Sequence, residues 1–487
     1  MTFDAPDSSA ETIPLWSLAE DSLVEFGEDT SLVVVTRWGE FDFPDAGPLV
    51  AEALRRMALG PVSLANVATS WEETGEQARA GGLSWTVPGA VALNRVLTEL
   101  SGSVVRSLGL NDGKGPLLSV VPVVPDPVFV PEEIAATGPV RLSRFSALRP
   151  GDGGLGLESP SAQFRVLLTQ PWAAHVAASL GKATSVAEIV AQEGIPADVV
   201  TQLVTYLVAS GCVVAGDDGG WFAEDADPGL SLWSYEELLF HDRTRTWQAN
   251  GLPETAEPPR SPVTKPLGPG QEFVLHRPDL ADRAATDPTL TELLETDHAA
   301  PAFTTRELSA EQIGEFLYRA ARIRSSGPAS LPDGTAGEVS QRPYVSMARL
   351  YELELYLTVN RCSGLPQGIY HYDPAGHRLV LISLDTADHA ILLDMAMVAA
   401  ANHRRPAALL SVTTRMARTA PVLGSRAYAA ALLHLGALQE TLYLTATAMG
   451  LAAHAVSVDA GDRVGRALRL DWPAEVCVGE CALDLAP

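Results

Sequence analysis

The chain has 487 residues, of which 46% are hydrophobic and 19% charged, so it can bury large cores in about two to four domains. Sixty acidic residues against 34 basic ones leave a net charge of −26. Because such a surface repels phosphate groups, we expect neither nucleic acid nor an anionic membrane as a partner.

The cysteines and the first residues bear on the compartment. Four cysteines, Cys212, Cys362, Cys477 and Cys481, are too few for a disulfide framework in so long a chain. Cys477 and Cys481 lack two further ligands for a metal, so we expect core cysteines and no metal site. The first residues have no basic and apolar secretion signal, and no apolar run approaches a membrane span. The sequence therefore predicts a cytoplasmic protein.

Hydrophobic periodicity predicts short elements near the start of the chain. They are a hairpin over 31–43, helices over 48–57 and 90–102, and a strand over 104–108. Pro48 suits the first turn of its helix, where a missing N–H costs little. Helices followed by short strands are the outline of a winged helix, so residues 1–115 are predicted to form a first winged-helix-like lobe.

The same outline recurs in the next part of the chain. The expected elements are strands over 141–147, 164–168 and 212–215 and helices over 171–180, 185–193 and 196–210. Gly211 is placed to end the third helix. Residues 116–248 are therefore predicted to form a second winged-helix-like lobe.

The third helix of such a lobe usually carries basic side chains when the lobe binds DNA. Helix 196–210 contains Asp198 and neither lysine nor arginine, so nucleic acid is disfavoured. The groove between a strand edge and this apolar helix is a better place for an extended peptide to add as a strand. Two interpretations stay open, a peptide-binding lobe and a lobe that only packs on the rest of the protein.

A linker is predicted over residues 249–272, because this segment is rich in proline and glycine. A third domain is expected over 273–487. Its clearest feature is a meander of three strands over 354–360, 369–372 and 378–382. A helix with an apolar face of Leu290, Leu293 and Leu294 is predicted over 288–297, and a capped helix over 307–323. The segment 325–340 is interpreted as a loop that covers a site or is simply mobile.

The residues from Ser340 to Leu384 resemble the centre of the SagB-type azoline dehydrogenases, flavoenzymes of the nitroreductase superfamily that oxidise thiazolines and oxazolines in ribosomally made peptides. The family pattern is R-P-Y-P-S-x-G-x-L-Y-x-L-E-L-Y, then G-L-x-x-G-x-Y-H-Y-D-P-x-x-H-x-L. The matching residues are Arg342, Pro343, Tyr344, Ser346, Leu350, Tyr351, Glu354, Tyr356, Gly368, Tyr370, His371, Tyr372, Asp373, Pro374 and His377. Val345 and Ala348 replace a proline and a glycine of the pattern.

The resemblance covers nearly the whole chain and implies an α+β fold, with tandem winged-helix-like N-terminal lobes followed by a nitroreductase-like domain. It also implies FMN at a dimer interface, with Arg342, Ser346 and Tyr344 as binding residues. The family's phosphate motif, R-R-S-x-R, is replaced here by Asp297, His298, Ala299, Ala300 and Pro301. An aspartate at that place repels the phosphate that the arginines would neutralise.

Two further family motifs differ in this chain. The W-K-Y string, whose lysine and tyrosine the family uses as an acid and base pair, aligns with Pro421, Val422 and Leu423. Neither Val422 nor Leu423 can transfer a proton. The family's glycine-rich turn beside the flavin corresponds to residues 455–459, whose side chains would crowd the ring.

The favoured hypothesis is a SagB-like protein with degenerate FMN-binding and catalytic motifs. It would be a binding or scaffolding partner that brings a precursor peptide to an active dehydrogenase or cyclodehydratase subunit, as a homodimer or heterodimer. One alternative is an active FMN-dependent thiazoline/oxazoline dehydrogenase. A second alternative is a non-redox acid–base enzyme acting on a peptide. Its candidate residues are His298, His454 and Glu440, with His434 and Asp459 nearby.

Overall fold

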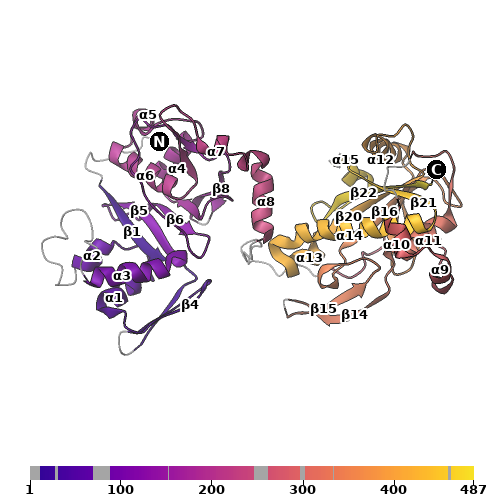
Figure 1. Ribbon diagram of the computed structural model, residues 1–487, viewed down its shortest axis with the longest axis horizontal. Helices are drawn as coiled ribbons and strands as arrows, with labels where there is room; N and C mark the ends of the chain where they lie inside the picture. The colour runs from indigo at the N-terminus through magenta and orange to yellow at the C-terminus, as the bar shows by residue number, and fades with distance from the viewer. Residues whose placement is uncertain are drawn as a thin grey trace. The chain divides into compact units, whose positions relative to one another are not determined.

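The structure is a computed structural model, and it describes residues 11–27, 31–69, 88–151, 153–245, 261–296, 302–332, 334–458 and 462–486. The chain divides into two compact units, Met1–Asp242 and Arg243–Pro487 (Figure 1). We call them the N-terminal and the C-terminal unit. Among the residues in these ranges, no helix is both long and apolar enough to span a membrane.

A six-stranded antiparallel sheet runs through the N-terminal unit in the order β1-β5-β6-β10-β9-β8. Its strands are β1 Thr12–Leu18, β5 Val104–Leu110, β6 Pro116–Pro122, β8 Ala147–Gly151, β9 Gly154–Glu158 and β10 Phe164–Leu168. The predicted lobe boundary at residue 115 falls between β5 and β6, which pair directly, Leu108 lying opposite Leu118. The two predicted lobes therefore share one sheet.

The first part of this unit adds a small sheet and three helices. They are β2 Leu23–Phe26, β3 Leu32–Thr36 and β4 Gly39–Phe43, with α1 Gly47–Met57, α2 Leu64–Thr69 and α3 Pro88–Glu99. The predicted hairpin is confirmed, since β3 pairs with β4 around a turn at Gly39, whose φ of 136° suits glycine. Val34, Leu54 and Leu93 belong to the core cluster that joins this sheet to α1 and α3.

The second part contains three helices, α4 Pro171–Ser179, α5 Val186–Glu193 and α6 Ala197–Ala209, and two short paired strands, β7 Val140–Leu142 and β11 Val213–Ala215. The three helices confirm the predicted ones to within two residues. The predicted strand over 141–147 is wrong in its middle, because Ser143 and Ser146 close a turn between β7 and β8. Two helices follow, α7 Ala223–Ala226 and α8 Tyr235–Arg245.

A seven-stranded antiparallel sheet forms the centre of the C-terminal unit, in the order β12-β19-β18-β16-β20-β22-β21. Its strands are β12 Glu272–Val274, β16 Leu353–Val359, β18 Gly368–Asp373, β19 Arg378–Ser383, β20 Ala408–Arg415, β21 Leu451–Val456 and β22 Glu475–Leu485. The predicted three-stranded meander is confirmed as β16, β18 and β19. Every residue of β16 is buried, as expected for a central strand with both faces covered.

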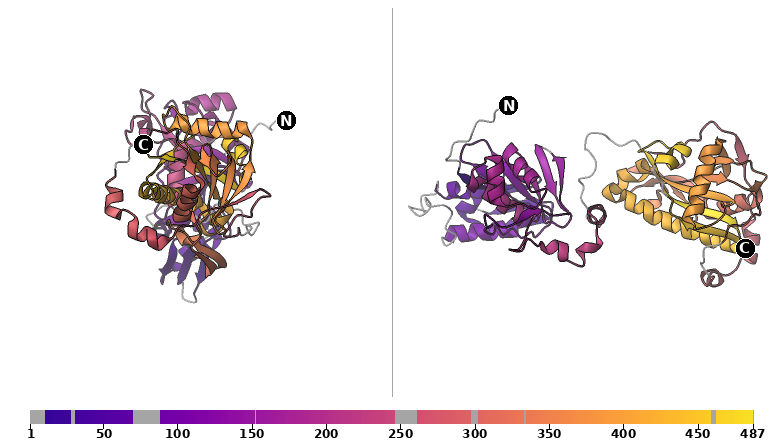
Figure 2. Two further views of the ribbon diagram at one scale, coloured as in Figure 1. Left: turned by 90° about the vertical axis from the view of Figure 1, so that its right-hand side faces the viewer. Right: turned by 90° about the horizontal axis from the view of Figure 1, so that it is seen from above.

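Helices cover both faces of this sheet, α12 above the strands and α14 below them in Figure 1. The helices of the unit are α9 Leu280–Thr286, α10 Leu290–Leu294, α11 Ala310–Ala321, α12 Thr386–Ala399, α13 Met416–Leu423, α14 Ala427–Ala448 and α15 Asp462–Ala467. Side chains alternate along β16, so Leu355 packs in the cluster of α11 and α14, whereas Tyr356 packs in the cluster of α12 and α15. The 22-residue α14 runs along most of the unit (Figure 2).

Two expectations for this unit are corrected. The segment 325–340 is not a loop, because β14 Ser325–Ser330 and β15 Ala336–Gln341 pair as an antiparallel hairpin. The helix expected over 288–297 is the short α10, and its Leu290 and Leu294 are 63% and 50% exposed instead of forming a buried face. The last two short strands, β13 Leu308–Ser309 and β17 Cys362–Ser363, pair in parallel.

Candidate functional site

The segment before β16 is where the resemblance places the flavin, and two of its three predicted ligand residues face the core. Arg342 is 5% exposed and donates from Nη1 to the Leu353 carbonyl at 3.1 Å and from Nη2 to the Tyr351 carbonyl at 3.3 Å. Tyr344 is buried, and burial raises the pKa of its hydroxyl. Ser346 is half-buried, and its Oγ accepts the Tyr351 N–H at 3.1 Å.

These three residues do not fit a flavin phosphate as they stand. The guanidinium is committed to backbone carbonyls inside the protein, and the serine hydroxyl caps its own loop. A phosphate clamp instead needs exposed cationic donors that fork onto its oxygens. The segment 297–301, where the family's arginine motif would align, lies outside the described residues, as does His298 within it.

The same loop has a strained backbone. Ala348, Arg349 and Tyr351 have φ angles of 53°, 56° and 48°, in the left-handed region that costs a residue with a side chain about 1–2 kcal/mol. Ala348 stands where the family pattern has glycine. Its backbone has the left-handed conformation that suits glycine, although alanine carries a Cβ. Backbone strain of this kind is retained where the surrounding structure enforces it, most often at functional sites.

His434 of α14 is the residue that holds this loop. Its Nε2 accepts the Met347 N–H at 2.7 Å, so the proton lies on Nδ1 and is donated to Glu352 Oε1 at 2.6 Å. His434 and Glu352 are 3% and 0% exposed. Since both ring nitrogens are occupied, His434 serves as a structural link and is not placed to exchange protons with a substrate.

The other predicted residues do not converge on one place. Val422 and Leu423 are half-buried hydrocarbon side chains at the end of α13. His454 is half-buried on β21, and Glu440 is exposed on α14. Within the described ranges, no hydrogen bond or ion pair joins these two residues, and no group of three or more His, Cys, Asp or Glu side chains could hold a metal ion. Asp459 lies outside those ranges.

A buried polar network lies on the opposite face of the sheet and contains residues of the family pattern. Glu354 is 1% exposed and meets His371 Nε2 at 3.0 Å and Arg415 Nε at 2.8 Å. Burial acts to raise the pKa of Glu354, but the hydrogen bond from His371 and the charge of Arg415 outweigh burial and lower that pKa. Glu354 is therefore held as a carboxylate.

The network continues to a lysine from the predicted linker. Lys265 Nζ donates to the Tyr356 hydroxyl at 2.6 Å and to Glu475 Oε2. Tyr356 and Thr413 donate to Glu475 Oε1 at 2.9 and 2.6 Å. Burial and then the charge of Glu475 raise the pKa of Tyr356.

Arg415 fastens the same linker segment to the sheet, with Nη1 at 2.7 Å from Ser261 Oγ and Nη2 at 3.0 Å from the Val263 carbonyl. Residues 261–265 are therefore tied across this face. Sequence reasoning did not identify Lys265, Arg415 or Glu475. The sequence did contain a clue to two of them, because each is a charged residue at the end of an apolar strand. Arg415 is the last residue of β20, and Glu475 is the first residue of β22.

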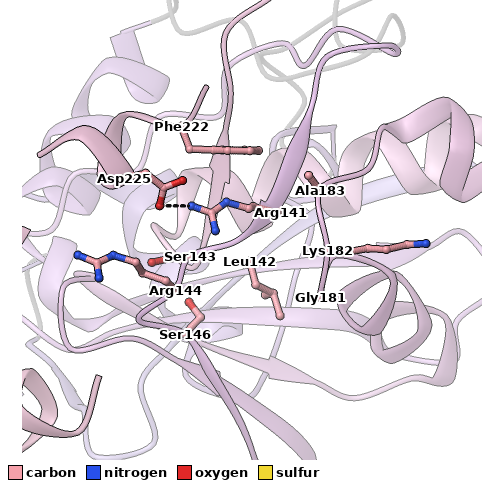
Figure 3. A pocket seen from close by; sticks show the side chains of 10 residues that line it. All are labelled: Arg141, Leu142, Ser143, Arg144, Ser146, Gly181, Lys182, Ala183, Phe222 and Asp225. Atoms are coloured by element: carbon pink, nitrogen blue, oxygen red, sulfur yellow. Dashed lines mark hydrogen bonds and ion pairs between the residues drawn. The ribbon is translucent and has the colours of Figure 1, made fainter. Parts of the chain in front are cut away.

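A cavity of about 520 Å³ in the N-terminal unit is the second candidate site (Figure 3). Three segments line it, which are β7 with the turn after it, the α4–α5 loop and the start of α7. The lining residues used below are Arg141, Leu142, Arg144, Lys182, Phe222 and Asp225. This cavity is not the groove predicted beside the third helix, since no residue of α6 lines it.

One wall of this cavity is an arginine held between two carboxylates. The Arg141 guanidinium lies over the Phe222 ring, 4.4 Å from its centroid, and its Nη2 is 2.7 Å from both Glu224 Oε1 and Asp225 Oδ1. Glu224 is 9% exposed and also accepts the Ser143 hydroxyl at 2.7 Å. These contacts give the cavity a fixed wall.

Comparison with known proteins gives a family model and a curated relative that are similar to parts of the chain. Residues 140–250 match the family model of the cyanobactin oxidase ThcOx. MJ1384 of Methanocaldococcus jannaschii, which is named as a nitroreductase, is 23% identical over 204 residues, 41% of this chain and 92% of that protein.

Two solved structures are also similar. One, from Anabaena variabilis and described as a nitroreductase, has a TM-score of 0.37 and 19% identity over 50% of this chain and 45% of its own. The other is the E. coli microcin synthetase McbBCD complex with truncated pro-MccB17 bound, with a TM-score of 0.33 and 18% identity over 50% of this chain and 85% of that chain. By sequence, the chain is thus similar to an oxidase family model and to a curated protein named as a nitroreductase.

Proposed function

We propose that this chain works in the formation of azoles in ribosomally made peptides, as a SagB-like protein that binds the precursor peptide and retains no flavin of its own. The observation that carries the proposal is the position of the cavity. All the residues that line it lie within the segment 140–250, the part that matches the cyanobactin oxidase model. A peptide would be held there by the winged-helix-like second lobe, formed by α4–α6 with β7 and β11.

The C-terminal unit supports the absence of a flavin. Arg342 and Tyr344 are buried in the core, and Ala348 carries a Cβ where the family pattern has glycine. Val422 and Leu423 replace the lysine and tyrosine that the family uses for proton transfer. With FMN bound, the cofactor would accept the two hydrogens that an azoline loses, and the residues just named, all in the described part of the chain, provide neither its phosphate clamp nor its acid and base pair.

A partner subunit is supported by an exposed apolar stripe on α14. Tyr428, Leu432 and Leu433 are 40%, 37% and 63% exposed, and a Cβ added at Gly436 would meet nothing within 4 Å. Large apolar side chains gathered on one exposed helix face are typical of a surface that another protein covers. We assign this face to an active dehydrogenase or cyclodehydratase subunit, or to a second copy of the chain.

The second candidate function is an active FMN-dependent azoline dehydrogenase. One observation favours it, the strained loop over 346–351, because strain without a function tends to be lost. In that case Ser346, which reaches the surface, would face the cofactor, and a second subunit would supply the phosphate contacts.

Mass spectrometry separates the two functions. An azoline-containing precursor peptide is incubated with the purified chain, with and without added FMN, and with an active dehydrogenase as a positive control. We expect the peptide to bind to the chain and to keep its mass in both reactions. A loss of two hydrogens catalysed by the chain alone would support the dehydrogenase.

A further inference from the structure

We propose that the cavity of the N-terminal unit recognises carboxylate side chains, so that the bound peptide segment is acidic. This inference rests on the proposed function, because it takes the precursor peptide as the ligand and adds its chemical character. The residues that carry it are Arg144 and Lys182, which both line the cavity and whose charged ends point in opposite directions in Figure 3.

Arg144 is a positioned cation whose charge is not balanced. Its guanidinium lies over the Phe145 ring, 4.3 Å from the centroid, and Nη2 donates to the Leu230 carbonyl at 2.5 Å. Both partners are neutral, and no carboxylate among the described residues forms an ion pair with Arg144. One bond uses one of five N–H donors, so the remaining donors can fork onto a carboxylate.

Lys182 adds a second cation from the α4–α5 loop. Its side chain is exposed, and no acidic partner within the described part of the chain lies at ion-pair distance. Arg141 contributes no net positive charge, because two carboxylates, Glu224 and Asp225, face its single guanidinium. The cavity thus combines a rigid wall of one arginine and two carboxylates with two cations, Arg144 and Lys182, that have no ion-pair partner among the described residues.

The location of these cations is informative, because the whole chain has a net charge of −26. The acidic surface of the chain would repel a small anion at long range. Only close contacts with Arg144 and Lys182 favour binding of an anion at this cavity. At physiological ionic strength charges are screened over about 8 Å, so the two cations in direct contact dominate over the distant acidic surface.

Apolar groups beside the cations point to a peptide. Leu142 is half-buried and Phe222 is 6% exposed, and both line the same cavity. A segment that alternates acidic and aliphatic residues offers carboxylates to Arg144 and Lys182 and hydrocarbon to Leu142 and Phe222.

The test uses two acetylated and amidated hexapeptides as probes, one alternating leucine with glutamate and the other leucine with glutamine. Binding to the full chain is measured by calorimetry at 0.15 M salt. We expect the glutamate peptide to bind at least about 10-fold more tightly than the glutamine peptide, as charge-assisted hydrogen bonds imply. Inorganic phosphate at the same concentration should not displace it.

Three charge-removing variants locate the effect. Arg144→Gln and Lys182→Gln should each weaken binding of the glutamate peptide about 3- to 10-fold. The control Lys114→Gln removes an exposed lysine of the same unit outside the cavity and should leave the affinity unchanged. Thermal unfolding of each variant checks that the fold is kept. Unchanged binding of the glutamine peptide is a second check, because this peptide has no carboxylate for Arg144 or Lys182 to bind.

Two kinds of result would contradict the proposal, and they can be told apart. Equal affinity for both peptides, an unchanged affinity when Arg144→Gln and Lys182→Gln are combined in one chain, or displacement by phosphate would overturn the carboxylate inference and leave peptide binding standing. Binding of neither hexapeptide, together with no binding of an azoline-containing precursor, would overturn the proposed function as well.

Discussion

His434 accepts the backbone N–H of Met347 at 2.7 Å, so the long helix α14 holds the strained loop that precedes β16. The other ring nitrogen is bonded to Glu352, which is fully buried. One histidine therefore stabilises a buried carboxylate and fixes the backbone at the place where the family pattern puts its flavin. The loop is consequently anchored to α14 through a buried side chain.

The His434→Ala variant should lower the free energy of unfolding by about 2–4 kcal/mol, because it leaves Glu352 buried without its partner. Denaturant titration measures this change. Trypsin should also cleave faster after the exposed Arg349, since the loop loses its anchor. The control is Glu440→Ala, an exposed position on the same helix, for which a change within about 0.5 kcal/mol is expected. Equal effects of the two substitutions would contradict the role given to His434.

Ala348→Gly should raise the free energy of unfolding by about 0.5–1 kcal/mol. Relief of a left-handed alanine gains about 1–2 kcal/mol, and the greater freedom of glycine in the unfolded chain offsets part of it. Ala329→Gly, on β14, where the backbone is extended, should instead lose about 0.5–1 kcal/mol. A loss of stability in Ala348→Gly as well as in Ala329→Gly would show that the backbone at Ala348 is not strained.

Two buried glutamates should give opposite pH effects on stability. The pKa of Glu354 lies below its ordinary value of 4.5 in the folded state, so its contribution is present above about pH 4.5 and is lost as the pH falls below it. Burial raises the pKa of Glu480, so this group destabilises the fold as the pH rises through 4.5 towards its folded pKa.

Urea unfolding from pH 3 to pH 7 tests the pair. Glu354→Gln should flatten the fall in stability below about pH 4.5 and reduce stability at pH 7, where His371 and Arg415 lose their partner. Glu480→Gln should increase stability at pH 7. A Glu354→Gln variant that is more stable at pH 7, or a Glu480→Gln variant that is less stable at pH 7, would contradict the predicted directions of these changes.

Lys265→Met should lower the free energy of unfolding by about 1–3 kcal/mol, because Glu475 is buried and Lys265 is its cationic partner. Arg37→Met is the matched control, since the Arg37–Asp21 pair is 37% and 40% exposed and such pairs contribute less than about 1 kcal/mol. Denaturation midpoints compare the two. A control loss as large as that of Lys265→Met would show that the buried network adds nothing.

Local sequence patterns predicted many of the helices and strands, but they did not predict how all the strands pair. The strands β16, β18 and β19 follow from alternation and turn residues, and α6 follows from its apolar periodicity. The hairpin of β14 and β15 was missed because its glycine, serine and proline residues have low strand propensity. The shared sheet was missed because β6, which pairs with β5 across the predicted lobe boundary, was not predicted as a strand.

The candidate sites depend even more on distant contacts. Lys265 and Glu475 are 210 positions apart, and Arg141 meets Glu224 across 83 positions, so no spacing rule could connect them. Arg342 and Tyr344 match the family pattern, but their burial is a property of packing that the matching letters do not reveal.

The most direct test of the central claim is an absorbance spectrum of the full chain after incubation with excess FMN and desalting. The account predicts a colourless protein without the absorption bands of bound flavin, although the peptide still binds. A yellow protein that retains about one FMN per chain through desalting would contradict it.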